Sequence, residues 1–339
     1  MAGRGIVIFG SSLDDLVAVT KRAEAAGFDT AWTTEFYTRS ATISLAATAL
    51  ATERITVGSA IAYAVGRSPL VLATEARDLD ELTGGGRLIL GLGAGTKRMQ
   101  QDWHGVDFSS PAKRIEELVP LLRQIWEMGP DGVAYEGAYY RMSLKPTAAL
   151  RPAVRIPVYL AGVRERMLQA AGAVADGQLG HPLFTRAYID EVVKPAIAAG
   201  AERTGRSASD VSRAGYVITA ISDDGETARR EAKAQIAFYS IVRTYDPIMA
   251  RHGWTADVDE MRNAWSRRDV ESMVAAVPDA MLDEMALAGT ADEVRDRFES
   301  DFARRHDHVL LYPPSYGIDP GRFAENANAI VDTFAEVRA

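Results

Sequence analysis

Short runs of consecutive apolar residues alternate along the chain with longer segments in which apolar residues recur every three or four positions. The short runs are typical of strands buried on both faces, and the longer segments are typical of helices that cover a sheet. The strands are predicted at 5–10, 29–35, 55–61, 87–93, 157–162, 177–182, 214–222 and 308–314. The helices are predicted at 13–26, 41–51, 69–83, 115–127, 164–175, 185–199, 226–237 and 291–303.

This alternation predicts repeated βα units around a parallel sheet. Eight units in a chain of 339 residues favour a closed (β/α)8 TIM barrel of the α/β class over an open doubly wound sheet. We therefore expect a single domain over 1–339.

Two segments interrupt the rhythm of the barrel. Residues 129–155, after strand four, contain tyrosines spaced as in a short hairpin or an extended excursion, and residues 239–284, between strands seven and eight, have helical spacing. Both insertions are expected over a barrel end. There they either shape the substrate pocket or pack against the barrel or a dimer partner.

Composition narrows the possible chemistry. The chain has no cysteine, which excludes disulfides, thiol nucleophiles, thiolate zinc sites and iron–sulfur clusters, so redox chemistry requires a bound organic cofactor. A formal net charge of −8 argues against a nucleic-acid partner. No apolar run reaches the ~18 residues of a membrane span, and the N-terminal run is too short for a signal peptide. We expect a cytoplasmic protein that does not bind a membrane.

Metal and serine-hydrolase catalysis are not expected. The predicted strand ends carry no pair of histidine or carboxylate residues with metal-ligand spacing, and the chain has no Gly-x-Ser-x-Gly turn. His306 and His308 flank the start of the eighth strand, which lies at the face opposite the active site of such barrels. We therefore expect these two histidines to be structural.

The carboxyl ends of the strands form the active site of (β/α)8 enzymes. Small residues dominate these ends and let backbone approach a flat ring, whereas a helix start beside a basic side chain favours a phosphate. The alternative is that the glycines only ease tight turns and that the basic side chain is solvated. The candidate cofactor-binding residues are Thr34, Ala60, Ile61, Gly93, Ala94, Gly95, Thr96, Ala161, Gly162, Val163 and Arg164.

Two polar residues at strand ends are candidate catalytic groups. Glu35 is expected to transfer a proton or to anchor the ring, or else to be a structural carboxylate paired with Arg39 or Arg67. His181 is expected to be functional or to be a satisfied core histidine. The candidate substrate-pocket residues are Tyr37, Tyr63 and Trp103.

Three motifs occur in order between residues 55 and 95. They are Arg67-Ser68-Pro69 at a predicted helix start, DELTGGGR from Asp80 to Arg87, and Gly91-Leu92-Gly93 at the end of strand four. With one extra glycine before Arg87, this order resembles the luciferase-like monooxygenase superfamily, particularly its actinobacterial branch that depends on the deazaflavin coenzyme F420. The resemblance extends over most of the chain.

The resemblance implies a barrel whose third strand ends in a non-prolyl cis peptide against the middle ring of the cofactor. By motif position this bond is Ala60–Ile61. Backbone at 93–96 and 161–164 would hold the ring edge and the phosphate-bearing tail, and the enzyme would be a homodimer. One departure is clear: glucose-phosphate dehydrogenase relatives carry Asp-His after the second strand, whereas this chain has Glu35-Phe36. This difference argues against a sugar-phosphate dehydrogenase.

The expected function is hydride transfer between C5 of coenzyme F420 and a small organic substrate. Lys97, Arg98, Arg164 and Arg166 are candidates for attracting the anionic oligoglutamate tail of F420, although a phosphate alone accounts for Arg164. One alternative is an FMN-dependent luciferase-like monooxygenase. The other, from a different class, is a barrel that binds flavin without turnover or a non-redox barrel.

Overall fold

The computed structural model describes residues 2–9 and 12–335. Gly10, at the end of the first predicted strand, lies outside the described residues, as do the ends of the predicted 1–339 domain. The chain divides into two compact units. The first unit comprises Met1–Trp32, Gly180–Pro195 and Arg213–Ala339, and the second unit comprises Thr33–Leu179 and Ala196–Ser212.

The first unit is built on parallel strands in the order β11-β10-β12-β1-β2. These strands are β1 (Gly3–Val7), β2 (Thr30–Thr33), β10 (Ser212–Ile221), β11 (Ala286–Gly289) and β12 (His308–Tyr312). Its longer helices are α1 (Leu13–Ala25), α8 (Gly225–Ser240), α13 (Ala291–Ser300) and α14 (Pro320–Thr333). His308 begins β12 and its Nε2 lies 2.8 Å from Thr30 Oγ1, a contact that agrees with the structural role predicted for this histidine.

The second unit has parallel strands in the order β3-β5-β8-β9, with β4 also paired to β5. These strands are β3 (Thr56–Ser59), β4 (Ala62–Tyr63), β5 (Leu88–Gly93), β8 (Val158–Ala161) and β9 (Gly177–Leu179). The helices are α2 (Ala41–Ala51), α3 (Pro69–Leu82), α4 (Pro111–Trp126), α5 (Glu165–Val174) and α7 (Lys194–Arg203). The core lies between strands and helices, where Leu88, Leu90 and Leu92 of β5 are buried. Burying each such side chain contributes roughly 1.5–3 kcal/mol.

Eight parallel strands, β1, β2, β3, β5, β8, β9, β10 and β12, alternate with helices along the chain. The fold is a (β/α)8 TIM barrel, as the apolar pattern predicts. The order of elements follows the prediction closely, with strand ends shifted by a few residues. The elements that were not predicted include the short strands β4 and β11 and the C-terminal helix α14.

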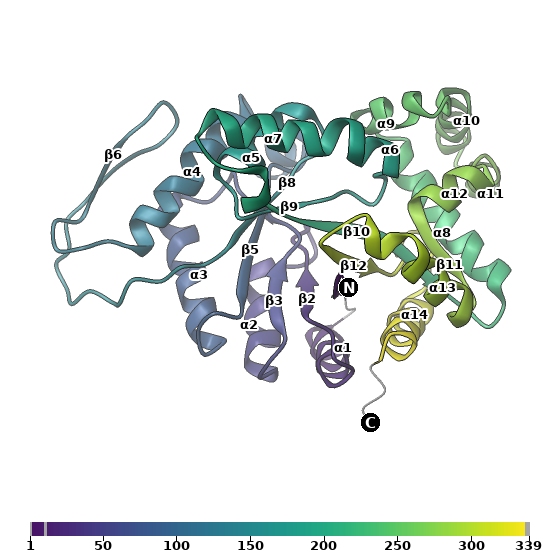
Figure 1. The fold of residues 1–339 in the computed structure, drawn as a ribbon, viewed down its shortest axis with the longest axis horizontal. Coiled ribbons are helices and arrows are strands. Elements are labelled where there is room, and N and C mark those ends of the chain that lie inside the picture. Colours follow the sequence, from purple (N-terminus) through teal and green to yellow (C-terminus); the bar gives the residue numbers. More distant parts are fainter. Residues whose placement is uncertain (1, 10–11, 336–339) are drawn as a thin grey trace. The chain divides into compact units, whose positions relative to one another are not determined.

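Both insertions have the predicted local structure. Strands β6 (Val133–Glu136) and β7 (Arg141–Leu144) form an antiparallel hairpin that projects beyond helix α4 (Figure 1). The second insertion folds into α9 (Asp246–Arg251), α10 (Thr255–Ser266), α11 (Val270–Ala275) and α12 (Asp279–Met285), which gather beside α8 (Figure 1). Val258 and Met261 of α10 are buried, so the helix presents the predicted apolar face.

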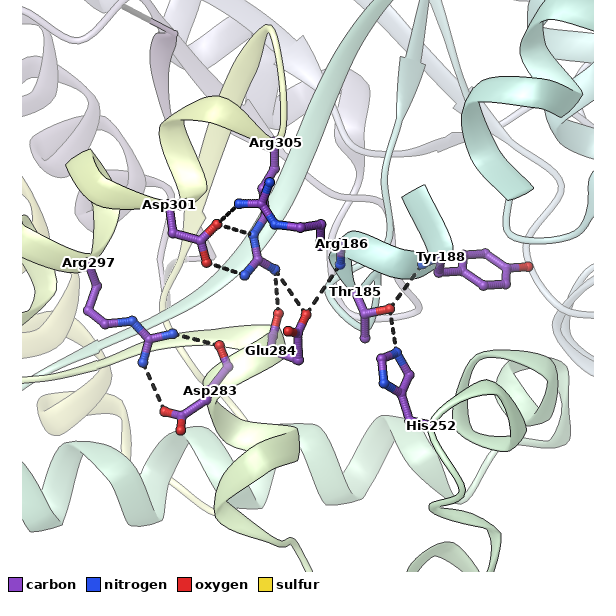
Figure 2. A network of polar contacts seen from close by, with 9 residues as sticks. All are labelled: Thr185, Arg186, Tyr188, His252, Asp283, Glu284, Arg297, Asp301 and Arg305. Carbon is purple, nitrogen blue, oxygen red and sulfur yellow. Dashed lines mark hydrogen bonds and ion pairs between the residues drawn. The ribbon is translucent and has the colours of Figure 1, made fainter. Parts of the chain in front are cut away.

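An ion-pair network holds the segment after β9 in the first unit (Figure 2). Asp301 bridges two arginines, because its carboxylate pairs with Arg186 and with Arg305. Arg305 also donates to the Glu284 carbonyl at 2.7 Å, and only 3% of its side chain is exposed. Burial alone would raise the pKa of Asp301, but hydrogen bonds and charge from the two arginines hold it below its ordinary value.

Candidate active site

In the second unit, strands β3 and β5 approach each other at two small residues. Ser59 Oγ donates to the Gly91 carbonyl at 2.8 Å and accepts from the Gly91 N–H at 3.0 Å. A β-carbon added at Gly91 would lie 1.7 Å from the Ser59 carbonyl oxygen. Only glycine therefore permits this close pairing.

Strand β3 stops at Ser59, and the chain resumes pairing at Ala62 in β4. The Ala60–Ile61 peptide bond between them is cis, as the family resemblance implies. The Ala60 N–H donates to the Thr33 carbonyl at 2.7 Å, and the Glu35 N–H donates to the Ile61 carbonyl at 2.9 Å. These bonds join the end of β2 to the interruption between β3 and β4.

Gly93 and Gly95, at the end of β5, lie beside this interruption. A β-carbon at Gly93 would lie 2.3 Å from Ile61 Cδ1, so the Ile61 side chain covers the glycine. Gly95 has φ +66, a left-handed conformation that favours glycine. Of their neighbours, Ala94 is buried, and Thr96 Oγ1 accepts from the Met99 N–H at 3.2 Å.

Glu35 is fixed by three hydrogen bonds. Arg67 donates to both carboxylate oxygens, at 2.8 and 2.5 Å, and the Tyr63 N–H donates to Oε2 at 2.8 Å. Only 10% of the Glu35 side chain is exposed. Of the partners expected from the sequence, Arg67 is therefore observed to pair with Glu35. The carboxylate ties the end of β2 to β4 and to the start of α3.

Three polar side chains near these strand ends are buried without a hydrogen-bond partner among the described residues. They are Thr33, Tyr63 and Gln100, and both the oxygen and the nitrogen of the Gln100 amide are unpaired. Gln100 lies in the π-helical turn η1 (Met99–Trp103), with its amide nitrogen beside Gly95. Burial, and to a lesser extent the charge of Glu35, raises the pKa of Tyr63 to about 12, so its phenol stays protonated. Buried unpaired polar groups commonly mark a place where a ligand or water completes the bonding.

The predicted substrate-pocket residues fall into two groups. Tyr37 and Trp103 lie together, with ring centroids 5.5 Å apart, and Phe36 completes an exposed trio with both. Tyr63 is buried and instead meets the ring of His104 edge-on at 5.2 Å. The prediction did not include Phe36, His104 or Gln100. Each lies within three residues of a predicted site residue, but none belongs to a sequence motif that would have identified it.

The start of helix α5 contains the remaining predicted cofactor residues. Ala161 ends β8, and Gly162 and Val163 lead to Arg164, the N-cap of α5, whose side chain does not cap the helix. A β-carbon at Gly162 would lie 2.8 Å from the Met167 β-carbon, so the loop packs closely on the helix. Thr34, after β2, is partly exposed.

Arg166 is occupied by an internal ion pair. Its guanidinium donates to both oxygens of Glu116, at 2.7 and 2.5 Å, and Arg203 pairs with the same carboxylate. Burial alone would raise the pKa of Glu116, but hydrogen bonds from the two arginines hold it below its ordinary value. The Arg166 guanidinium is thus engaged in an ion pair within the chain.

His181, the other candidate catalytic residue, belongs to the first unit. Its Nδ1 accepts from the Leu183 N–H at 3.2 Å, which assigns the ring proton to Nε2. The ring stacks on Tyr245 at 4.1 Å and meets Tyr239 edge-on at 5.0 Å. Burial lowers the pKa of His181 to about 3, so the imidazole is neutral at physiological pH.

Hydroxyl groups near His181 form a short chain. Tyr239 Oη lies 3.1 Å from Tyr312 Oη, which lies 3.1 Å from Ser315 Oγ. Tyr312 is the last residue of β12, so the chain is at the carboxyl end of that strand. Burial raises the pKa of Tyr239 and Tyr312, and both therefore act as neutral phenols.

Comparison with known proteins identifies the family. A model of luciferase-like monooxygenases matches residues 3–307. The chain belongs to the luciferase-like monooxygenase family. The resemblance found in the sequence is confirmed, and this luciferase-like chain is an oxidoreductase, as predicted.

Relatives of this luciferase-like chain include proteins named for redox chemistry. A 5,10-methylenetetrahydromethanopterin reductase of Archaeoglobus fulgidus is 30% identical over 295 residues, which cover 84% of each chain. A putative coenzyme F420-dependent oxidoreductase of Mycobacterium tuberculosis is 28% identical over 292 residues, covering 80% of this chain and 83% of the relative. The structure of a coenzyme F420-dependent tetrahydromethanopterin reductase from Methanopyrus kandleri is similar, with a TM-score of 0.81 and 26% identity over 98% of this chain and 99% of that one.

Within residues 2–9 and 12–335, no helix of this luciferase-like chain combines the length and the apolar character needed to cross a membrane.

Proposed function

We propose that the chain is a coenzyme F420-dependent oxidoreductase that transfers a hydride between C5 of the deazaflavin and a small organic substrate. The observation that carries the proposal is the group of strand ends in the second unit, where close-packed glycines meet buried polar side chains that lack partners. The putative F420-dependent oxidoreductase of Mycobacterium tuberculosis and the F420-dependent reductase of Methanopyrus kandleri support the choice of cofactor.

The residues at these strand ends suit a flat ring with a polar edge. Glycine at 93 and 95 lets Ile61 and Gln100 lie directly against the backbone of this strand end, and the Gln100 amide offers a donor and an acceptor side by side. We assign the ring to Thr34, Ala60, Ile61 and residues 93–96. When bound, F420 supplies or accepts the hydride.

The phosphate-bearing tail is assigned to the start of α5. This helix has ten residues, and its first N–H groups and dipole favour an anion. Ala161, Gly162, Val163 and Arg164 supply the loop that leads into it. Lys97 and Arg98 are exposed and remain candidates for binding the oligoglutamate tail. Arg166 is no longer assigned to the tail, because it pairs with Glu116.

Glu35 and His181 are assigned different roles in the reaction. Glu35 is an anchor, because its carboxylate already binds Arg67 and the Tyr63 N–H and holds the strand ends in place. His181 is a neutral hydrogen-bond donor through Nε2, suited to a carbonyl or hydroxyl oxygen of the substrate. Tyr37, Tyr63 and Trp103 are assigned to the substrate pocket.

A binding titration tests the cofactor assignment. Purified protein is titrated separately with F420 and with FMN, and fluorescence quenching gives the two dissociation constants. We expect micromolar or tighter binding of F420 and at least about tenfold weaker binding of FMN, a difference of about 1.4 kcal/mol. Preference for FMN would replace the proposal by an FMN-dependent monooxygenase, since a phosphate site at α5 suits FMN as well. If the folded protein binds neither cofactor, the proposal is wrong and the non-redox barrel is the remaining alternative.

Replacing Gln100 by methionine separates the ligand role of this amide from a structural one. Without cofactor, we expect the free energy of unfolding to stay unchanged or to rise by about 1 kcal/mol, because an unpaired buried amide is removed. F420 affinity should fall by about tenfold, because bonds to the ring edge are lost. Urea unfolding and fluorescence titration measure the two effects.

The matched control is Gln101→Met, which changes the adjacent exposed glutamine in the same turn. It should alter neither quantity. If Gln100→Met instead lowers the stability of the cofactor-free protein by more than about 1 kcal/mol, the amide has a structural partner and its assignment to the ring is wrong.

A further inference from the structure

A hollow of about 500 Å³ opens on the helical insertion of the first unit. It lies between the end of α10, the start of α11 and the segment after β12, and its lining includes Trp265, Arg268, Asp269, Val270, Met273 and Tyr316. Its volume falls within the roughly 300–1,000 Å³ of small-molecule sites. None of these residues takes part in the proposed cofactor site, which belongs to the second unit.

Two aromatic side chains, Trp265 and Tyr316, line the hollow, and neither is fully buried. Trp265 is 44% exposed, although Met261 and Ala264 of the same helix are buried. Tyr316 is fixed from behind, because its ring stacks on Phe238 at 4.4 Å and its N–H donates to Gln235 Oε1 at 2.9 Å. The ring centroids of Trp265 and Tyr316 are 6.1 Å apart. Such side chains favour a planar ring.

Arg268 is the basic residue in the lining of the hollow. The Arg268 guanidinium has no hydrogen bond or ion pair with any other residue of 2–9 or 12–335. Asp269, which also lines the hollow, caps α11 by accepting from the Ser272 N–H at 3.0 Å and forms no ion pair with Arg268. An unpaired guanidinium beside aromatic rings is suited to a carboxylate or a phosphate.

Arg268 has a backbone conformation that is unusual for an arginine. It follows the end of α10 with φ +58, in the left-handed region that favours glycine or asparagine. Backbone bonds close the helix end, from the Arg268 N–H to the Trp265 carbonyl and from the Asp269 N–H to the Ala264 carbonyl. The turn therefore does not require an arginine side chain.

We propose that this hollow binds a planar aromatic anion, with its ring against Trp265 and Tyr316 and its anionic group on Arg268. Two apolar side chains also line the hollow, Met273, which is fully buried, and Val270, which is exposed. Tyr316 stands four residues after the end of β12, on the side of the strands where barrel enzymes take their ligands. The site stands independently of the proposed cofactor, because its residues all belong to the first unit.

The test uses two probes that differ in charge, 2-naphthoate and 2-naphthamide. Calorimetric titration of the full-length protein without cofactor should give tighter binding of naphthoate than of naphthamide, by about tenfold for one charge-assisted contact. Arg268→Asn should remove this difference while leaving naphthamide binding unchanged. Asparagine accepts left-handed backbone, so this variant is expected to fold. Trp265→Ala should weaken both probes.

Arg267→Asn is the matched control, because it removes the adjacent exposed arginine, which does not line the hollow. It should preserve the preference for naphthoate. Equal affinity for the two probes, an equal loss in the two arginine variants, or unchanged binding in Trp265→Ala would each overturn the proposal. If neither probe binds and Trp265→Ala instead dissociates an oligomer in sedimentation, the surface is a contact between copies of the chain and the proposal is wrong.

Discussion

Gly91→Ala is expected to lower the free energy of unfolding by about 3 kcal/mol or more, at or beyond the upper end of the usual cost of overpacking. The added β-carbon would stand 1.7 Å from the Ser59 carbonyl oxygen, a backbone atom of the neighbouring strand. Relief requires that β3 and β5 separate, which breaks both hydrogen bonds between Ser59 Oγ and Gly91. Urea unfolding followed by circular dichroism measures the loss.

Gly129→Ala is the matched control for this substitution. An added β-carbon at Gly129 meets no atom within 4 Å, and the residue does not have the left-handed backbone that resists alanine. We expect a change within about 0.5 kcal/mol, or a slight gain from the lower entropy of the unfolded chain. A Gly91→Ala protein as stable as the Gly129→Ala protein would show that the strands do not approach as closely as described.

Asp301→Asn is expected to cost about 3 kcal/mol, because it leaves the buried Arg305 guanidinium with only the longer ion pair to Glu284, at 3.5 Å. Arg305 is 3% exposed and donates to both oxygens of Asp301, and Arg186 shares the same carboxylate (Figure 2). The Glu284 carbonyl still accepts from Arg305 and limits the loss. Asp283→Asn provides the control, since its pair with Arg297 is exposed and should contribute less than about 1 kcal/mol.

The effect of Asp301 depends on pH in a direction set by its lowered pKa. A carboxylate with a lowered pKa stabilises the fold fully above its unfolded value of about 3.9 and loses this contribution as the pH falls through the folded value. The difference between wild type and Asp301→Asn should therefore be constant near neutrality and shrink below about pH 4. Unfolding curves at several pH values measure it, and a difference that grows toward acid would contradict the ion-pair account.

Local patterns were sufficient to predict the architecture and the approximate positions of the strands. Apolar runs marked the parallel strands, and the glycines at 91, 93 and 95 marked the place where backbone approaches closely. Helix α14 was not predicted because the eight-unit pattern was already complete at β12. Asp319 and Pro320 nevertheless form an N-cap and first-turn pair, the signal that would have revealed it.

Contacts between distant residues were beyond what local patterns reveal. Arg39 and Arg67 were equally acceptable partners for Glu35, and the pairing with Arg67 depends on how β2, β4 and the start of α3 meet. Gln100 carried no signal, because its burial depends on a π-helical turn and on the left-handed backbone of Gly95. The single domain and the homodimer remain predictions.

Hydrogen–deuterium exchange with and without saturating F420 shows whether F420 binds at the strand ends of the second unit. The account predicts that F420 slows exchange in peptides covering residues 59–66, 93–104 and 161–167, while peptides of the β6–β7 hairpin exchange as before. FMN at the same concentration should protect these segments less. Protection confined to other segments, or none under conditions where F420 fluorescence shows binding, would contradict the account.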